Sequence, residues 1–238
     1  MLTLRSAVRT SLLLASMFLA NGAANAVVVT GSSGGTFSNV TSCDGNCRVN
    51  NTGNGANTQL EWGYTPPFLF IPGSGGSTLT AVNKSWSVNT DADDVVLAEL
   101  SWFNKATSDG RTPDVFGALY TLGIGFTSPN VAGDSEIFNL GITNQTNNAG
   151  DIINGLMMAD LNNLFFNLNG VVISDLKYSL FSGAGSTFVS NVWKNPEGVT
   201  STLRITADFK AVPEPASLAL LGVGLLGVGA LRRRRGRA

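Results

Sequence analysis

The chain has 238 residues, with 15 basic and 16 acidic side chains and no histidine. Between Val27 and Val212 there are eight basic and fifteen acidic residues, a net charge of −7, and the other basic residues lie at the two ends. A sparsely charged acidic surface without a basic patch argues against nucleic-acid binding. The lack of histidine excludes Ser-His-Asp and Cys-His catalysis, and histidine-ligated metal catalysis with them.

Residues 1–26 have the pattern of a Sec signal peptide. Arg5 and Arg9 precede the apolar run 11–20, and the tripeptide Ala-Asn-Ala at 24–26 provides a small-x-small cleavage site. An uncleaved anchor is the alternative, but the apolar run is too short to span a bilayer comfortably. We therefore predict export by the Sec machinery and a mature protein that begins at Val27.

The middle part, 27–211, is predicted to form a single all-β domain. Apolar–polar alternation indicates short strands, and Gly, Asn, Pro and Ser mark the turns between them. Segment 151–161 has some helical character, whereas 31–57 has so little apolar content that we expect a loose region. The pair Asn169 and Gly170 predicts a hairpin. The strands are expected at 27–30, 59–63, 68–71, 77–82, 85–89, 95–104, 116–126, 137–143, 164–168, 171–180, 188–193 and 202–209.

Many short strands with almost no helix are typical of an antiparallel β-sandwich or a jelly roll. The sequence does not distinguish between these two architectures. No internal repeat of fixed period occurs, which disfavours a solenoid or a propeller. The middle part is long enough for one domain with a substantial core and too short for two.

The last segment, 212–238, combines three features in order. A Pro-Glu-Pro triplet is followed by the apolar run 216–231 and then by an arginine cluster. As a helix, the apolar run would be about 24 Å long, slightly short of a ~30 Å hydrocarbon core, and snorkelling arginines can cover the difference. This order resembles the PEP-CTERM protein-sorting signal, with a transmembrane helix at its centre. The resemblance rests on Pro213, Glu214, Pro215, Arg232, Arg233, Arg234 and Arg235.

The resemblance implies how the protein is processed. In proteins with this signal, the tail enters the inner membrane transiently, and a transpeptidase-like enzyme called exosortase cuts at or near the Pro-Glu-Pro motif. Exosortase is then a partner, and the triplet is a recognition element with no catalytic role. The processed protein would reach the cell surface or the extracellular matrix of a Gram-negative bacterium. A permanent C-terminal anchor is the alternative.

Parts of the middle domain also resemble the choice-of-anchor K domain of secreted bacterial proteins. The resemblance covers most of 60–208 and depends on Trp62 with Gly63, Asn169 with Gly170, and the Pro-Glu-Gly triplet at 196–198. Members of that family often have a Leu-Gly segment followed by Thr-His-x-Asn, and the corresponding segment here, 122–126, has no histidine. The family has no established activity, so the resemblance implies secretion and no catalytic residue.

Cys43 and Cys47 are the only cysteines. Behind a signal peptide they would meet an oxidising compartment, and the Asp-Gly-Asn between them favours a turn. We therefore predict a local disulfide. A redox-active pair is the alternative, but the spacing is not that of a C-x-x-C motif.

Two sets of residues are candidates for ligand binding. Asp91, Asp93 and Asp94 are the densest acidic cluster and could bind Ca²⁺ through oxygen ligands, although the pattern of an EF-hand is absent and a solvated turn is the alternative. No other cofactor is predicted. Aromatic faces near Asn and Asp suit carbohydrates, and core packing is the alternative for such rings. The aromatic candidates are Trp62, Trp86 and Trp102.

Paired carboxylates are the remaining route to catalysis, since glycoside hydrolysis needs only two acids. Glu61, Glu99 and Glu136 lie on or beside expected strands, and alternation turns Glu99 toward solvent. We predict no enzymatic activity. The predicted protein is a secreted, exosortase-processed surface or matrix protein with a structural or interaction role in exopolysaccharide or biofilm. The alternatives are a carbohydrate- or calcium-dependent binding module and, less favoured, a carboxylate-based glycoside hydrolase.

Overall fold

The computed structural model describes residues 26–43, 46–51, 58–64, 69, 75–106, 115–145, 150–212 and 224. The chain divides into two units, Val27–Lys210 and a second unit made of the two ends. Of the second unit, only residues 26, 211, 212 and 224 are described.

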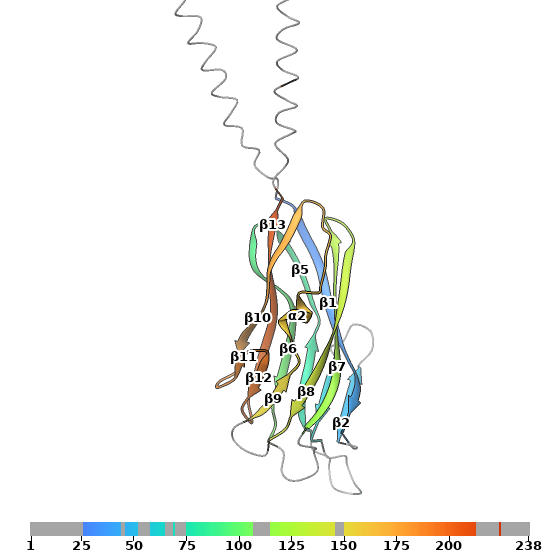
Figure 1. The fold of residues 1–238 in the computed structure, drawn as a ribbon, viewed down its shortest axis with the longest axis vertical. Coiled ribbons are helices and arrows are strands. Elements are labelled where there is room, and N and C mark those ends of the chain that lie inside the picture. The colour runs from blue at the N-terminus through green and yellow to red at the C-terminus, as the bar shows by residue number, and fades with distance from the viewer. Residues whose placement is uncertain are drawn as a thin grey trace, which may run out of the picture. The chain divides into compact units, whose positions relative to one another are not determined.

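The first unit is a sandwich of two antiparallel sheets, so the predicted all-β fold is confirmed (Figure 1). The seven-stranded sheet has the order β11 (Thr187–Val189), β12 (Val192–Asn195), β9 (Asp151–Asn154), β8 (Ala132–Thr143), β7 (Val115–Ser128), β1 (Val28–Thr41) and β5 (Lys84–Asn89). The six-stranded sheet has the order β10 (Val171–Ser182), β13 (Thr200–Ala211), β6 (Ala92–Phe103), β4 (Ser77–Val82), β3 (Thr58–Trp62) and β2 (Cys47–Asn51). One short helix, α2 (Met158–Leu161), precedes β10.

The core lies between the sheets and follows from strand alternation. In β7, every second residue from Phe116 to Phe126 is buried, as the period of a strand requires. Burial of each large apolar side chain in this set stabilises the fold by roughly 1.5–3 kcal/mol. The largest fully buried side chains are Trp62, Trp102, Trp193, Tyr120, Phe37, Phe116, Phe126, Phe138 and Phe209.

Strand β1 is much longer than the sequence indicated, because several positions on its core-facing side, between Val29 and Phe37, are small residues. A Cβ atom at Gly35 would lie 2.6 Å from the ring of Tyr120, and one at Gly31 would lie 2.5 Å from Trp86. The glycines leave room for large rings supplied by other strands. Segment 31–41, expected to be loose, is therefore a strand whose apolar partners come from elsewhere in the chain.

Three other expectations are corrected. Of segment 151–161, expected to have some helical character, only Met158–Leu161 is helical (α2), and residues 151–154 form strand β9, because Ile153 is buried between Ile142 of β8 and Trp193 of β12. The expected strand at 188–193 is two strands, since the chain turns at Ser190 and Asn191, both of which have positive φ. Segment 164–168 is not a strand, and only an isolated bridge between Leu168 and Val171 spans the Asn169–Gly170 turn. The expected strand at 68–71 lies outside the described residues except for residue 69.

The first and last strands of the sandwich meet at one of its ends (Figure 1). The backbone N–H of Thr90 donates to the carbonyl of Val27 at 2.8 Å, and the N–H of Asp91 donates to the carbonyl of Phe209 at 2.6 Å. The turn between β5 and β6 therefore bonds to the start of β1 and to the end of β13. The chain enters and leaves the sandwich at the same end.

Candidate functional site

The residues of the predicted sorting motif and the proposed transmembrane helix lie outside the described residues. These are Pro213, Glu214, Pro215, Arg232, Arg233, Arg234 and Arg235, with the apolar run 216–231 except for residue 224. The signal peptide up to residue 25 lies outside them as well. Among the residues that are described, no helix is long and apolar enough to cross a membrane.

The predicted disulfide between Cys43 and Cys47 is present. It links the region after β1 to the first residue of β2, an edge strand of the six-stranded sheet. The backbone N–H of Gly63 donates to the carbonyl of Asn46 at 3.0 Å, which holds this region against the end of β3. The bridge therefore supports the edge of the sheet.

The three tryptophans proposed as ligand-binding residues are core residues. Trp62 and Trp102 are fully buried, and Trp86 is 8% exposed. The ring of Trp102 lies 6.2 Å from Trp62 and 5.2 Å from Trp193, and Trp86 lies 5.5 Å from Phe126. A stacking platform needs one open ring face. Since these rings are enclosed by protein, the structure corrects their proposed role as sugar-stacking platforms.

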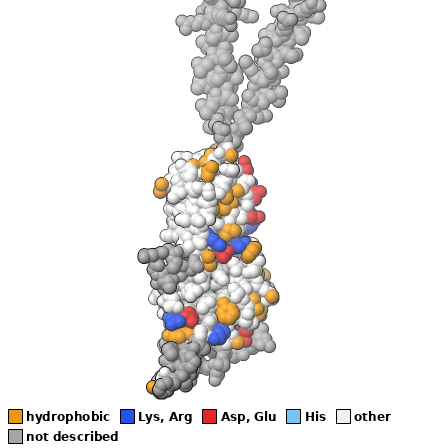
Figure 2. Space-filling view, turned by 180° about the vertical axis from the view of Figure 1, so that it is seen from behind, with side chains coloured by type: hydrophobic (Ala, Val, Ile, Leu, Met, Phe, Trp, Pro, Cys, Tyr) orange, Lys and Arg blue, Asp and Glu red, His pale blue; other side chains and the backbone are white. Residues whose placement is uncertain are grey.

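Glu61 and Glu99 lie on strands of the six-stranded sheet, and both form ion pairs. Glu61 accepts from Nε of Arg48 at 2.6 Å, and this bond raises the pKa of Arg48. Glu99 lies 3.1 Å from Nζ of Lys84 and 3.0 Å from Nε of Arg204. In Figure 2, the visible face is mostly uncharged, and basic and acidic side chains lie together at several places on it.

The spacing of Glu61 and Glu99 does not fit glycoside hydrolysis. Glu61 pairs with Thr78 of β4, and Glu99 pairs with Val82 of the same strand. Four residues of strand place the two positions roughly 13 Å apart along β4 alone. Catalytic carboxylates of glycosidases lie within about 5–9.5 Å of one another. This pair is therefore structural.

The acidic residues assemble in a different set from the one predicted. Carboxylate oxygens of Asp94, Asp175 and Asp208 lie within 4.8 Å of one another. They come from β6, β10 and β13, which are neighbours in the six-stranded sheet. Asp93 pairs instead with Lys210, and Asp91 is not part of the triad. Of the predicted ligands only Asp94 belongs to it.

A lysine neutralises part of this triad. Nζ of Lys177 lies 2.8 Å from Asp94 and 2.5 Å from Asp175, and both carboxylates raise the pKa of the ammonium group. Asp208 accepts from the backbone N–H of Asp94 at 2.8 Å. No local pattern in the sequence could have predicted the triad, because its members are separated by more than thirty residues and are joined only by strand pairing.

A buried acid at the start of β9 was also missed. Asp151 is 1% exposed, and its Oδ1 accepts from the backbone N–H of Gln145 at 2.9 Å. Burial raises the pKa of Asp151 to about 6; the N–H of Gln145 and the nearby Trp62 act in the opposite direction, and the charge of Glu197 adds to the increase. Its neighbour across the strand pair, Asn195, is fully buried.

Asn195 connects the two sheets at this position. Its Nδ2 donates to the carbonyl of Trp102 at 3.0 Å, and its own carbonyl accepts from Nδ2 of Asn104 at 2.7 Å. Its Oδ1 accepts from the hydroxyl of Ser186 at 2.7 Å. A buried polar group costs stability unless it is bonded in this way. The role of Asn195 is therefore structural.

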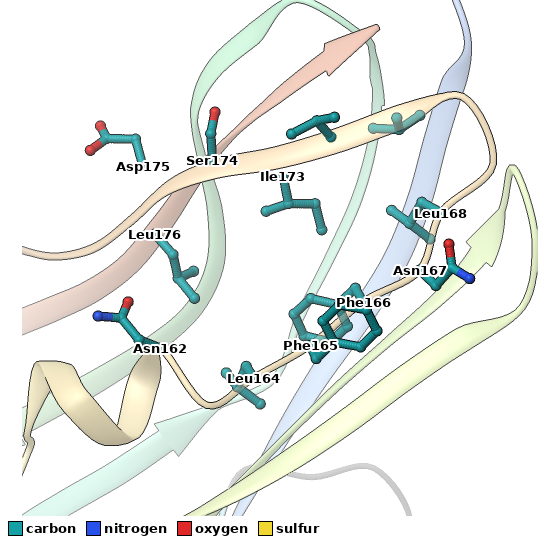
Figure 3. A pocket seen from close by; sticks show the side chains of 12 residues that line it. Asn162, Leu164, Phe165, Phe166, Asn167, Leu168, Ile173, Ser174, Asp175 and Leu176 are labelled. Carbon is teal, nitrogen blue, oxygen red and sulfur yellow. The ribbon is translucent and has the colours of Figure 1, made fainter. Parts of the chain in front are cut away.

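A pocket of about 510 Å³ lies between segment 162–168 and strand β10 (Figure 3). Apolar side chains from both sides, including Leu164, Phe166, Ile173 and Leu176, line it. Asp175 lines the pocket too and is also a member of the acidic triad. In Figure 3 the carboxylate of Asp175 points away from the apolar side chains, so the pocket does not gather polar groups around one point.

Comparison with known proteins identifies one feature of this chain. A model of the PEP-CTERM protein-sorting motif matches residues 211–235. No curated protein and no solved structure matches the chain. The match begins at Ala211, the last residue of β13, and agrees with the motif predicted from the sequence. The chain thus carries a PEP-CTERM sorting motif, which implies a secreted protein that exosortase processes at the cell envelope or surface of a Gram-negative bacterium.

Proposed function

We propose that the protein is a non-enzymatic structural or interaction component of the extracellular matrix, in contact with exopolysaccharide. The observation that supports this is the direct connection between sandwich and sorting motif. Strand β13 ends at Ala211, where the motif begins, so no linker separates them. Removal of the tail near the Pro-Glu-Pro triplet would leave a folded body with only a few residues beyond its last core strand.

The sandwich has features of a body that is presented to the outside. The start of its first strand and the end of its last strand are bonded to the same turn, through Thr90 and Asp91. Its edge near β2 is tied by a disulfide, which persists in an oxidising environment. We further propose that the domain is of the choice-of-anchor K type, on the sequence pattern described above.

The proposal is tested by following the mature protein in cells with and without exosortase. With the enzyme, we expect intact mass to show a species that begins at Val27 and ends near Pro213. We expect cell fractionation to find this species in the extracellular matrix. Without the enzyme, the inner-membrane fraction should contain a species that retains Arg232. A mature protein that keeps its arginine cluster in wild-type cells would contradict processing, and a processed protein found only in the free medium would contradict the matrix role.

A second candidate function, calcium-dependent binding, is favoured by the triad Asp94, Asp175 and Asp208. Three carboxylates within 4.8 Å of one another provide oxygen ligands of the kind that Ca²⁺ prefers. Lys177 occupies the cluster through its ammonium group, so Ca²⁺ would have to displace it. Binding would therefore be weakened by the lysine and strengthened by its removal.

We expect Ca²⁺ to raise the melting temperature of the protein if this second function holds. At a free concentration of about one hundred times Kd, binding adds roughly 2.7 kcal/mol of stability, a shift of about 5–10 °C for a domain of this size. Asp208→Asn should abolish the shift, Lys177→Met should enlarge it, and Asp160→Asn, outside the triad, should leave it unchanged. An equal shift in all four proteins would rule the triad out as its source.

A further inference from the structure

One outer surface of the sandwich differs from the rest in that it has no charge. It is the side of strands β5, β1, β7 and β8 that faces away from the core. Residues paired in register share a face, so its composition can be taken from the pairing. Row by row it consists of Ser85, Ser32, Gly125 and Gly133; Gly34, Gly123 and Ser135; Thr36, Thr121 and Ile137; Ser38, Leu119 and Asn139; Thr41, Gly117 and Gly141; and Val115 with Thr143. We call this set the uncharged face.

The charged residues of these four strands all point to the opposite side. Lys84, Asp134 and Glu136 are the only ones, and they pair with Ser33, Ile124 and Leu122, which are buried. Lys84 in turn reaches Glu99 of the other sheet. The domain as a whole carries a net charge of −7, so the neutrality of this face is not a consequence of a neutral protein.

The uncharged face also exposes aliphatic side chains and lacks rings. Ile137 is 52% exposed and Val115 is 61% exposed. The aromatic residues of the same strands, among them Phe37, Tyr120 and Phe138, are all buried on the core side. Without an exposed ring the face offers no stacking surface for a sugar. A flat apolar and hydroxyl-bearing surface is better suited to another flat protein surface.

Two glycines on this face have no packing role inside the molecule. Among the described residues, the atom nearest to a Cβ built at Gly123 is the carbonyl oxygen of Gly34 at 3.9 Å, and the one nearest to a Cβ at Gly125 is that of Ser32 at 4.0 Å. Neither residue has positive φ. Glycine in a strand interior is unfavourable compared with other residues, and it is typical of places where another backbone approaches closely. Packing within the described part of the protomer therefore does not require these two glycines, and a close approach by another molecule would.

We propose that the uncharged face packs against the same face of a second copy of the protein, sheet upon sheet. A face without charge is complementary to itself, because no side chain needs a partner of opposite sign, and a two-fold axis brings identical patches together. Elsewhere the acidic surfaces of two copies repel each other. The three long strands with β5 cover roughly 600 Å² per copy, or about 1,200 Å² for a pair, which exceeds the ~1,000 Å² of a specific interface.

The test is the mass in solution of the exported protein, purified from its own cells, as a function of concentration by analytical ultracentrifugation. We expect a dimer. Gly123→Lys places a charge at the centre of the face without a clash inside the protomer, and it should raise the dissociation constant at least about tenfold. Ser101→Lys is the matched control, because Ser101 lies on the outer side of the other sheet, and it should leave the dissociation constant unchanged.

A second variant tests whether the glycine at position 123 serves the interface between two copies or the fold of one copy. Gly123→Thr adds a side chain that strands favour, so it should raise the melting temperature of the protomer by a few degrees and still weaken the dimer. A wild-type protein that stays monomeric at about 100 μM, or a dimer that Gly123→Lys does not weaken, would overturn the proposal. So would a monomer that binds a neutral polysaccharide and loses this binding in Gly123→Lys, since the occupant would then be a glycan. These outcomes do not depend on the matrix role, which the fractionation experiment tests separately.

Discussion

Replacing Trp102 with alanine is expected to lower the free energy of unfolding by about 3–5 kcal/mol. The ring is fully buried between the sheets, in contact with Trp62 and Trp193, and its removal would leave a cavity that two paired sheets cannot close. Urea denaturation followed by circular dichroism measures the loss. Phe165→Ala is the control, because Phe165 is 75% exposed, and it should change the stability by no more than about 0.5 kcal/mol.

The same variant tests the role of the tryptophans in ligand binding. If Trp102→Ala keeps the stability of the wild type within about 1 kcal/mol and loses binding to a polysaccharide, the ring must be open in solution. That result would restore the sugar-stacking role and contradict the buried position found here. A large loss of stability, with any change in binding explained by unfolding, would agree with the structure.

The second large effect is a dependence of stability on pH that originates at Asp151. Its folded-state pKa, about 6, lies above the ordinary value of 3.8. The folded protein therefore binds this proton more tightly than the unfolded chain does. The contribution of Asp151 to stability is fully present below about pH 4 and is lost as the pH rises through 6. At 1.36 kcal/mol per pKa unit, an increase from 3.8 to about 6 corresponds to a loss of about 2–3 kcal/mol.

Asp151→Asn should remove this dependence. We expect the variant to match the wild type near pH 4 and to exceed its stability at pH 7.5 by about 1–2 kcal/mol, because a neutral amide is cheaper to bury than a carboxylate. Urea unfolding at a series of pH values measures the difference. Glu197→Gln removes a charge that raises the pKa of Asp151, so it should move the midpoint of the loss to lower pH. Parallel pH profiles for wild type and Asp151→Asn would show that another group is responsible.

The sequence by itself determined the features that depend on local order. The sorting motif is a linear signal, so its triplet, apolar run and arginines could be recognised without a fold, and the family comparison finds the motif at 211–235. The strands β4, β6, β7 and β13 follow from alternation along a single stretch of chain, and the structure has them near the expected places. The disulfide between Cys43 and Cys47 joins cysteines that are four positions apart in the sequence, so spacing and compartment were enough.

Only the tertiary structure decided which residues meet. The sequence does not distinguish a buried tryptophan from an exposed one that could stack on a sugar. Trp62 and Trp102 are core residues because the opposite sheet covers them. Segment 31–41 looked like a loop because its glycines are complementary to rings that come from distant strands. The triad of Asp94, Asp175 and Asp208, the burial of Asp151 and the uncharged face all depend on strand order and register. Those are set by packing between segments far apart in the chain, and no window of local sequence contains that information.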